Sequence, residues 1–225
     1  MGTRAIRSEQ SNDDGLPDFD ATFVAQLDEL FRWRRDERHF RSEPLPDGLI
    51  DQLLGIADLA PSVGNCQPWR FVRVTSPERR AAVMDNFRRA NAEALDALDD
   101  VHAANYARLK LEGLGQSPEH LAVFADTDPI QGLGLGRRTM PETVAYSAVA
   151  AIQTLWLAAR ARGVGVGWVS IFEVERLKAD LEIPTDWLLV GYLCIGFPVK
   201  PHDTPELERV GWQSRTPLSE RVYLR

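Results

Sequence analysis

The segment from Thr139 to Arg162 constrains the fold more than any other part of this chain, because its apolar side chains leave little polar face. Thr139 and Glu142 have the spacing of a capping box, and Gly163 is a typical C-cap, so the sequence predicts one helix between them. A helix that is hydrophobic nearly all round is expected to be buried. We therefore expect it at the centre of a large core or in a subunit interface. Its apolar residues are Val144, Tyr146, Ala148, Val149, Ile152, Leu155, Trp156 and Ala159.

Around this helix the hydrophobic pattern alternates between helices and short strands, which predicts one α+β domain. Asp20 is a predicted N-cap for an amphipathic helix that ends in a cationic run at 34–38. A long polar helix is expected from Ser76 to Gly113, since Ser76 and Pro77 form a typical helix start. Strands are expected at 71–74, 121–125, 166–171 and 188–197, with shorter helices at 47–60 and between the last two strands.

The two ends of the chain differ from the region between them. Residues 1–19 are polar and charged and predict a mobile arm, so the single domain is expected to cover residues 20–225. Residues 198–225 hold four prolines and no strong periodicity. They predict an extended C-terminal tail that wraps another subunit.

Charge and cysteine content argue against several classes of function. The 225 residues include 26 Lys and Arg against 33 Asp and Glu, and this net charge of −7 argues against a nucleic-acid binder. No apolar run is long enough to span a membrane, and the polar N-terminus is unlike a secretory signal, so a cytoplasmic protein is expected. Cys66 and Cys194 belong to no metal-binding spacing, so no metal site is predicted.

Arginines gather at the end of the first predicted helix, in the run Arg34-Arg35-Asp36-Glu37-Arg38. Two interpretations stay open for this run. Cations at a helix C-terminus complement the negative end of the helix dipole. Alternatively, their planar forked donors suit a phosphate or a polyhydroxyl chain. Asp36 among these arginines should stay ionised, and it is a weak base unless burial offsets their charge.

Two further segments carry binding groups. The loop from Ala60 to Trp69 combines glycine and proline with hydroxyl, amide and indole groups, which indicates either a tight packed turn or a ligand-binding loop. Gly163, Gly165 and Gly167 lead into a strand, where glycine permits the close approach of another backbone or of a flat ligand. Ser170 lies at the end of that strand.

Together these segments resemble the nitroreductase-like flavoproteins and, within them, the dimethylbenzimidazole synthases. The resemblance runs from about Phe31 to Val222, and the loop APSVGNCQPW is similar to many flavin reductases of the superfamily. The run RRDER, combined with LKLEG at 109–113 and GVGWVSIF at 165–172, is more specific to the synthases.

The resemblance implies a nitroreductase-like α+β fold, with an antiparallel-rich central sheet flanked by helices. It also implies a swapped homodimer that binds FMN at the subunit interface. By this resemblance, the FMN phosphate and ribityl chain would be held by Arg34, Arg35, Arg38 and Arg215. The residues along the flavin would be Ser62, Gly64 and Gln67. Asp36 and Ser170 fall on the two positions that the family uses for its chemistry. The LKLEG segment, expected to be helical, would help to cover the flavin.

The implied reaction is an oxygen-dependent fragmentation of reduced FMN to 5,6-dimethylbenzimidazole, the lower ligand of cobalamin. NAD(P)H would enter only through a separate flavin reductase. Asp36 is the acid–base candidate, and the Ser170 hydroxyl would steer the reacting groups by hydrogen bonding.

Two alternatives stay open: an NAD(P)H-dependent nitroreductase that recycles FMN, and a non-catalytic flavin-binding protein. The family pattern is broken at Val144, at Asn65-Cys66 and at Gln116-Ser117, and these departures are expected at the pocket rim and in dimer contacts.

Overall fold

Four antiparallel strands in the order β1-β2-β4-β3 form the centre of the molecule. The computed structural model describes residues 17–225, so most of the arm expected at 1–19 lies outside the described residues. The strands are β1 (Trp69–Arg73), β2 (Glu119–Asp126), β3 (Gly165–Val169) and β4 (Trp187–Gly196). The interior of β2 is buried on both faces, as expected for a central strand covered by helices on each side. The predicted α+β class with an antiparallel sheet is confirmed.

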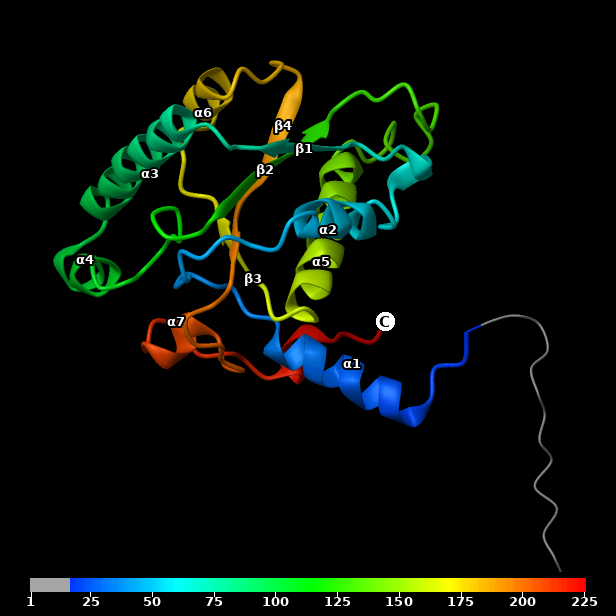
Figure 1. Ribbon diagram of the computed structural model, residues 1–225, viewed down its shortest axis with the longest axis horizontal. Coiled ribbons are helices and arrows are strands. Elements are labelled where there is room, and N and C mark those ends of the chain that lie inside the picture. Colours follow the sequence, from blue (N-terminus) through cyan, green and yellow to red (C-terminus); the bar gives the residue numbers. More distant parts are fainter. Residues whose placement is uncertain (1–16) are drawn as a thin grey trace, which may run out of the picture.

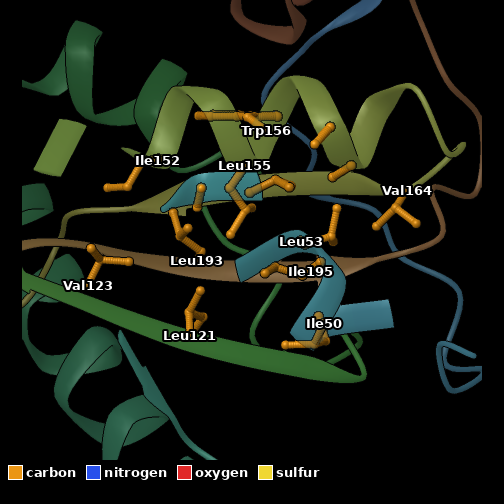
Figure 2. Packing of buried hydrophobic residues seen from close by; sticks show 14 of the residues in the cluster. Ile50, Leu53, Leu121, Val123, Ile152, Leu155, Trp156, Val164, Leu193 and Ile195 are labelled. Carbon is orange, nitrogen blue, oxygen red and sulfur yellow. The ribbon is translucent and has the colours of Figure 1, made fainter. Parts of the chain in front are cut away.

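Helices α2 (Leu49–Ala57) and α5 (Thr143–Arg160) cover one face of the sheet (Figure 1). Figure 2 shows Ile152, Leu155 and Trp156 of α5 packed over the strands, with Leu193 and Ile195 of β4 beneath them. Because these side chains are 6 % exposed or less, this layer is the main hydrophobic core.

The opposite face is covered by α3 (Pro77–Asp96) and α6 (Val174–Asp180), and α4 (Asp100–Tyr106) follows α3 at the end of the layer (Figure 1). A buried amide joins the two main helices: Asn86 donates to the carbonyl of Glu173 (3.0 Å) and accepts from its N–H (2.9 Å). This pairing leaves neither polar group of Asn86 unsatisfied in the core.

At one end of the sheet, α1 (Ala21–Trp33) lies near α7 (Glu206–Arg209) and the C-terminus (Figure 1). The predicted cap is confirmed, because the Asp20 carboxylate accepts from the N–H of Phe23 (2.7 Å). The tail beyond β4 contains α7 and a 3-10 turn, η2 (Leu218–Arg221). No helix within residues 17–225 is both long and apolar enough to cross a membrane.

The long helix predicted from Ser76 to Gly113 is wrong in its second half. Ser76 caps α3 as expected, by accepting from the N–H of Arg79, but the helix ends at Asp96. The Asp99 carboxylate then accepts from the N–H of His102 and starts α4 as a separate helix. Residues 107–118, which include the LKLEG segment, form no regular element.

The apolar helix α5 is present, but its predicted capping box is wrong. No side chain caps it, and Thr139 lies in a preceding turn where its hydroxyl donates to the carbonyl of Gly136 (3.0 Å). Only nine of its 18 residues are buried within the chain. Tyr146 and Val149 are 58 % and 40 % exposed, so the chain itself leaves one face of the helix uncovered, and the expected subunit interface stays open as a prediction.

His120 and Tyr192 form a polar pair inside the second core layer. The His120 Nδ1 atom lies 2.8 Å from the Tyr192 hydroxyl, and the His120 side chain is 2 % exposed. Burial, with the nearby Arg80 charge, lowers the pKa of His120 from 6.5 to about 4. The imidazole is therefore neutral in the folded protein near neutral pH.

This pKa predicts an acid-sensitive fold. The unfolded chain binds a proton at His120 below about pH 6.5, whereas the folded chain does so only near pH 4. The contribution to stability is complete above pH 6.5 and falls by about 2 kcal/mol between pH 7 and 5. Denaturant unfolding across this range should show a flatter pH profile for His120→Asn than for the natural chain. Parallel profiles would contradict the prediction.

Candidate active site

The segment that follows α1 pairs with the edge strand β3. Asp36 forms a parallel bridge with Val166, and Glu37 donates its N–H to the Val166 carbonyl (3.0 Å). A Cβ on Gly167 would lie 2.0 Å from the Glu37 carbonyl oxygen, so glycine is required for this approach. The prediction that a glycine of this run admits another backbone is confirmed at Gly167, and that backbone belongs to the arginine-rich run.

Asp36 is held by hydrogen bonds on both carboxylate oxygens. Oδ1 accepts from the N–H of Trp168 (2.8 Å), and Oδ2 accepts from Nε of Arg38 (2.9 Å). Burial raises the pKa of Asp36, although these two bonds and the charges of Arg38 and Arg34 lower it. Burial therefore offsets the arginines, which was the condition for this carboxylate to act as a base. A third of the side chain remains exposed to a reactant.

Arg34, Arg35 and Arg215 form an electrostatic cluster. Burial lowers the pKa of Arg34 and Arg35, and the Arg215 charge lowers both further. The Arg34 guanidinium lies over the Trp156 ring, 4.9 Å from its centroid. Arg35 donates to the Arg32 carbonyl at the end of α1 (2.8 Å). The helix-end interpretation thus holds for Arg35, and the convergence of cations far apart in sequence also fits an anionic group.

Arg38 contacts Asp36 directly, whereas Ser170 is related to it only through β3. The Arg38 guanidinium is largely buried, and its Nη1 donates to the Lys110 carbonyl (2.8 Å). Ser170 directly follows β3 and is exposed, two residues beyond the Trp168 N–H that binds Asp36. The sequence drew attention to LKLEG, but no pattern in it identified the Lys110 carbonyl or the Trp168 N–H as partners.

The loop with Ser62, Gly64 and Gln67 has an unusual backbone. Gly64 and Gln67 have φ values of 55° and 44°, and the intervening Asn65 has 53°. The Ser62 hydroxyl accepts from the N–H of Gln67 (3.0 Å) and closes the turn. Left-handed residues in such density occur mainly where a site constrains the backbone.

A neighbouring loop that the sequence did not associate with the site supports this turn. Gln131 donates to the Asn65 carbonyl (2.6 Å) and to the Gln67 amide oxygen (3.0 Å). A Cβ on Gly64 would lie 2.9 Å from the Leu135 carbonyl oxygen. Gln131 and Leu135 come from a glycine-rich loop that had no motif of its own.

Within one chain, the arginine cluster and the Ser62–Gln67 loop lie at opposite ends of α5. Trp156 donates its indole N–H to the Arg35 carbonyl (3.3 Å), whereas Ser147 accepts from the N–H of Val63 (3.0 Å). Ser147 and Trp156 are nine positions apart along the helix, which corresponds to about 13–14 Å. The structure therefore brings the predicted site residues together as two groups.

The cavities follow the same division. A cleft of about 880 Å³ borders Gln67 together with Trp69 and Arg70, but does not contain Asp36. A smaller cavity of about 280 Å³ is lined by Arg35 and Asp36. Within the described residues, no group of three or more His, Cys, Asp or Glu side chains could hold a metal ion.

Comparison with known proteins agrees with this architecture. The model of the nitroreductase family matches residues 31–197, which include all of β1–β4 and α2–α6. The chain belongs to the nitroreductase family. Within the family it is 56 % identical over 201 residues to a 5,6-dimethylbenzimidazole synthase of Rhodospirillum rubrum, covering 89 % of this chain and 95 % of that protein. It is 49 % identical over 199 residues to a synthase of the same name from Rhodobacter capsulatus, covering 88 % and 96 %.

Solved structures share the fold at lower identity. Oxidized iodotyrosine deiodinase bound to FMN and 3-iodo-L-tyrosine superposes with a TM-score of 0.68 at 21 % identity, covering 88 % of this chain and 97 % of that one. A BluB-like flavoprotein from Clostridium difficile 630 gives 0.67 at 21 % identity, covering 88 % and 98 %.

The departures from the family pattern have a structural explanation. Val144, Cys66 and Ser117 are all buried, at 4 %, 3 % and 5 % exposure. Val144 and Ser117 pack inside the chain, so their expected position at the pocket rim is wrong. Cys66 lines the cleft of about 880 Å³ beside Gln67, as expected. Asn65, within the Ser62–Gln67 loop, and Gln116 are exposed.

The loop conformation predicts a selective effect of glycine replacement. Gly64→Ala should lower the free energy of unfolding by about 1–2 kcal/mol, because alanine is strained at a positive φ and its Cβ meets the Leu135 carbonyl. Gly55→Ala is the matched control, since nothing lies near its Cβ in α2, and should raise stability by about 0.5–1 kcal/mol. Equal effects in thermal unfolding would contradict this explanation.

Proposed function

We propose that this chain is an aerobic 5,6-dimethylbenzimidazole synthase, which uses oxygen to fragment reduced FMN. The observation that carries the proposal is its 56 % identity, over 95 % of the relative's length, to a protein of that name. The nitroreductases among the solved structures are only about one-fifth identical, as in the 20 % of the Bacillus cereus protein, and support a common fold alone. Sequence similarity therefore favours the synthase over the recycling nitroreductase.

The side chains of this site suit reduced FMN. Arg34, Arg35 and Arg215 would hold the phosphate, because their charges converge: burial lowers the pKa of Arg34 and Arg35 most, and the Arg215 charge lowers both further. Arg38 would face the ribityl chain and ring from its position beside Asp36. When bound, reduced FMN supplies both the electrons for oxygen and the carbon atoms of the product.

Asp36 would act as the proton acceptor at the ribityl carbons. Its raised pKa makes it a stronger base than an exposed aspartate. The Trp168 N–H binds Oδ1 and so fixes the orientation of the carboxylate. Ser170, exposed at the end of the adjacent strand, would direct a reacting group by hydrogen bonding. A separate flavin reductase would supply reduced FMN, and the reaction would take place in the cytoplasm.

A swapped homodimer would complete the site. The outer face of α5 carries Tyr146, Val149 and Gln153, with Leu157 one turn further on. Two such faces packed antiparallel around their middle would bring the Ser147 end of one helix beside the Trp156 end of the other. The Ser62–Gln67 loop of one subunit would then lie along the flavin held by the arginines of its partner.

The function is tested with chemically reduced FMN, air and purified protein, without NAD(P)H. We expect 5,6-dimethylbenzimidazole by chromatography and mass spectrometry. Asp36→Asn and Ser170→Gly should still bind FMN but lose about 100-fold or more in product formation. Asp51→Asn, an exposed carboxylate paired with Arg73, is the matched control and should retain activity.

Two results would contradict the proposal that the chain is a synthase. Sustained NAD(P)H oxidation with a nitroaromatic, and no dimethylbenzimidazole, would identify a recycling nitroreductase. FMN binding with neither reaction would identify a flavin-binding protein. Full product formation by Asp36→Asn would remove that residue from the mechanism.

The shared site is tested by mixing Asp36→Asn with Gly64→Ala, after confirming a dimer by light scattering and showing that each variant alone forms no product. If each site combines Asp36 of one chain with the Ser62–Gln67 loop of the other, a mixed dimer contains one site in which both parts are unchanged. If each site lies within one chain, both sites of a mixed dimer carry a substitution. Half of the dimers are mixed and each has one intact site, so about a quarter of natural activity should return. If activity does not return although mixed dimers form, each site lies within one chain.

A further inference from the structure

Residues 107–118 lie against the Asp36 site although they form no helix or strand. A Cβ on Gly113 would lie 2.3 Å from the Phe40 ring, so the backbone rests directly on the residue two positions beyond Arg38. Leu114 and Ser117 are buried, at 6 % and 5 % exposure. A segment without backbone ladder bonds needs side chains to hold it in this position.

Glu112 makes several of the contacts that fix this segment. Its Oε2 accepts from the backbone N–H groups of Leu114 and Gly115, which closes the turn that follows it. Its Oε1 accepts from the Lys110 ammonium at 2.9 Å, and the Glu112 side chain is only 16 % exposed. One carboxylate thus fixes residues on both sides of itself, and the low exposure shields its ion pair from water.

Lys110 connects this turn to the site through its backbone. Its carbonyl accepts from Arg38 Nη1 (2.8 Å), while Nε of the same guanidinium donates to Asp36 Oδ2 (2.9 Å). Because the guanidinium is planar and rigid, the position of the carbonyl sets the direction of the Nε–H. The Arg38 side chain is 13 % exposed, so protein contacts define its orientation.

We propose that Glu112 is a positioning residue, which fixes the Lys110 carbonyl so that Arg38 presents its Nε–H to Asp36. Glu112 itself does not touch Asp36, and it acts through two intermediate residues. Its importance for turnover rests on the proposed function of Asp36. The contacts that join Glu112, Lys110, Arg38 and Asp36 do not depend on which reaction the site catalyses.

The proposal has a consequence for the proton affinity of Asp36. Charged and titratable groups face this carboxylate from several elements: Arg34 and Arg38 on its own segment and Cys194 on β4, with Lys110 and Glu112 behind Arg38. The cavity that contains Asp36 is also lined by Arg35, Glu37, His39, Lys200, His202, Glu206 and Arg209. The Arg38 hydrogen bond and charge lower the pKa of Asp36. A displaced Arg38 should therefore let that pKa rise further.

The test is a carboxyl ¹³C NMR titration of Asp36 in the FMN-free full chain, with the signal assigned by its loss in Asp36→Asn. Glu112→Gln keeps the size of the side chain but removes the ion pair with Lys110, and its Asp36 midpoint should move upward by about half a pH unit or more. Glu119→Gln is the matched control, because Glu119 is 24 % exposed and pairs with Arg73 instead. Its Asp36 midpoint should equal that of the natural chain.

An unchanged midpoint in Glu112→Gln, or an equal shift in Glu119→Gln, would overturn the proposal. If Glu112→Gln does not fold, Lys110→Met removes the same ion pair and is judged by the same titration. Tryptic cleavage after Lys110 should also be faster in Glu112→Gln. A shifted midpoint without any dimethylbenzimidazole from the natural chain would refute the proposed function while retaining the role of Glu112.

Discussion

The candidate site depends on a backbone contact that leaves no room for a side chain. The chain leaving α1 pairs with β3 where Gly167 faces the Glu37 carbonyl, and any larger residue there would separate them. Side chains of an extended segment alternate in direction, so this pairing also decides which residues share a side. Asp36 and Arg38 therefore lie together, and Arg38 also reaches the Lys110 carbonyl.

Helix α5 connects that contact to the second half of the site. Its inner face builds the core shown in Figure 2. Near its C-terminal end Trp156 binds the Arg35 carbonyl, and one hydroxyl near its N-terminal end, that of Ser147, binds the loop at Val63. A rigid helix packed into the core keeps these two groups at a fixed separation, and its exposed face is the surface that a second subunit would use.

Local signals were sufficient where the interacting groups are close in sequence. The caps at Asp20 and Ser76, the central strands and the apolar α5 could all be predicted, because each depends on residues within one or two turns. The helix expected to reach Gly113 failed because two acidic side chains compete for backbone N–H groups. Asp99 starts a new helix, and Glu112 closes a turn instead.

By itself, the sequence determined the strand and helix types, the arginine-rich run and the loop that belong to the nitroreductase family, because these follow from periodicity and short motifs. Only the tertiary structure determined the pKa of Asp36. Its pKa is set by burial against charges and by the N–H of Trp168, 132 positions away in the chain. The division of the site between two ends of α5 was likewise decided by packing, since spacing along a sequence does not report distances across a fold.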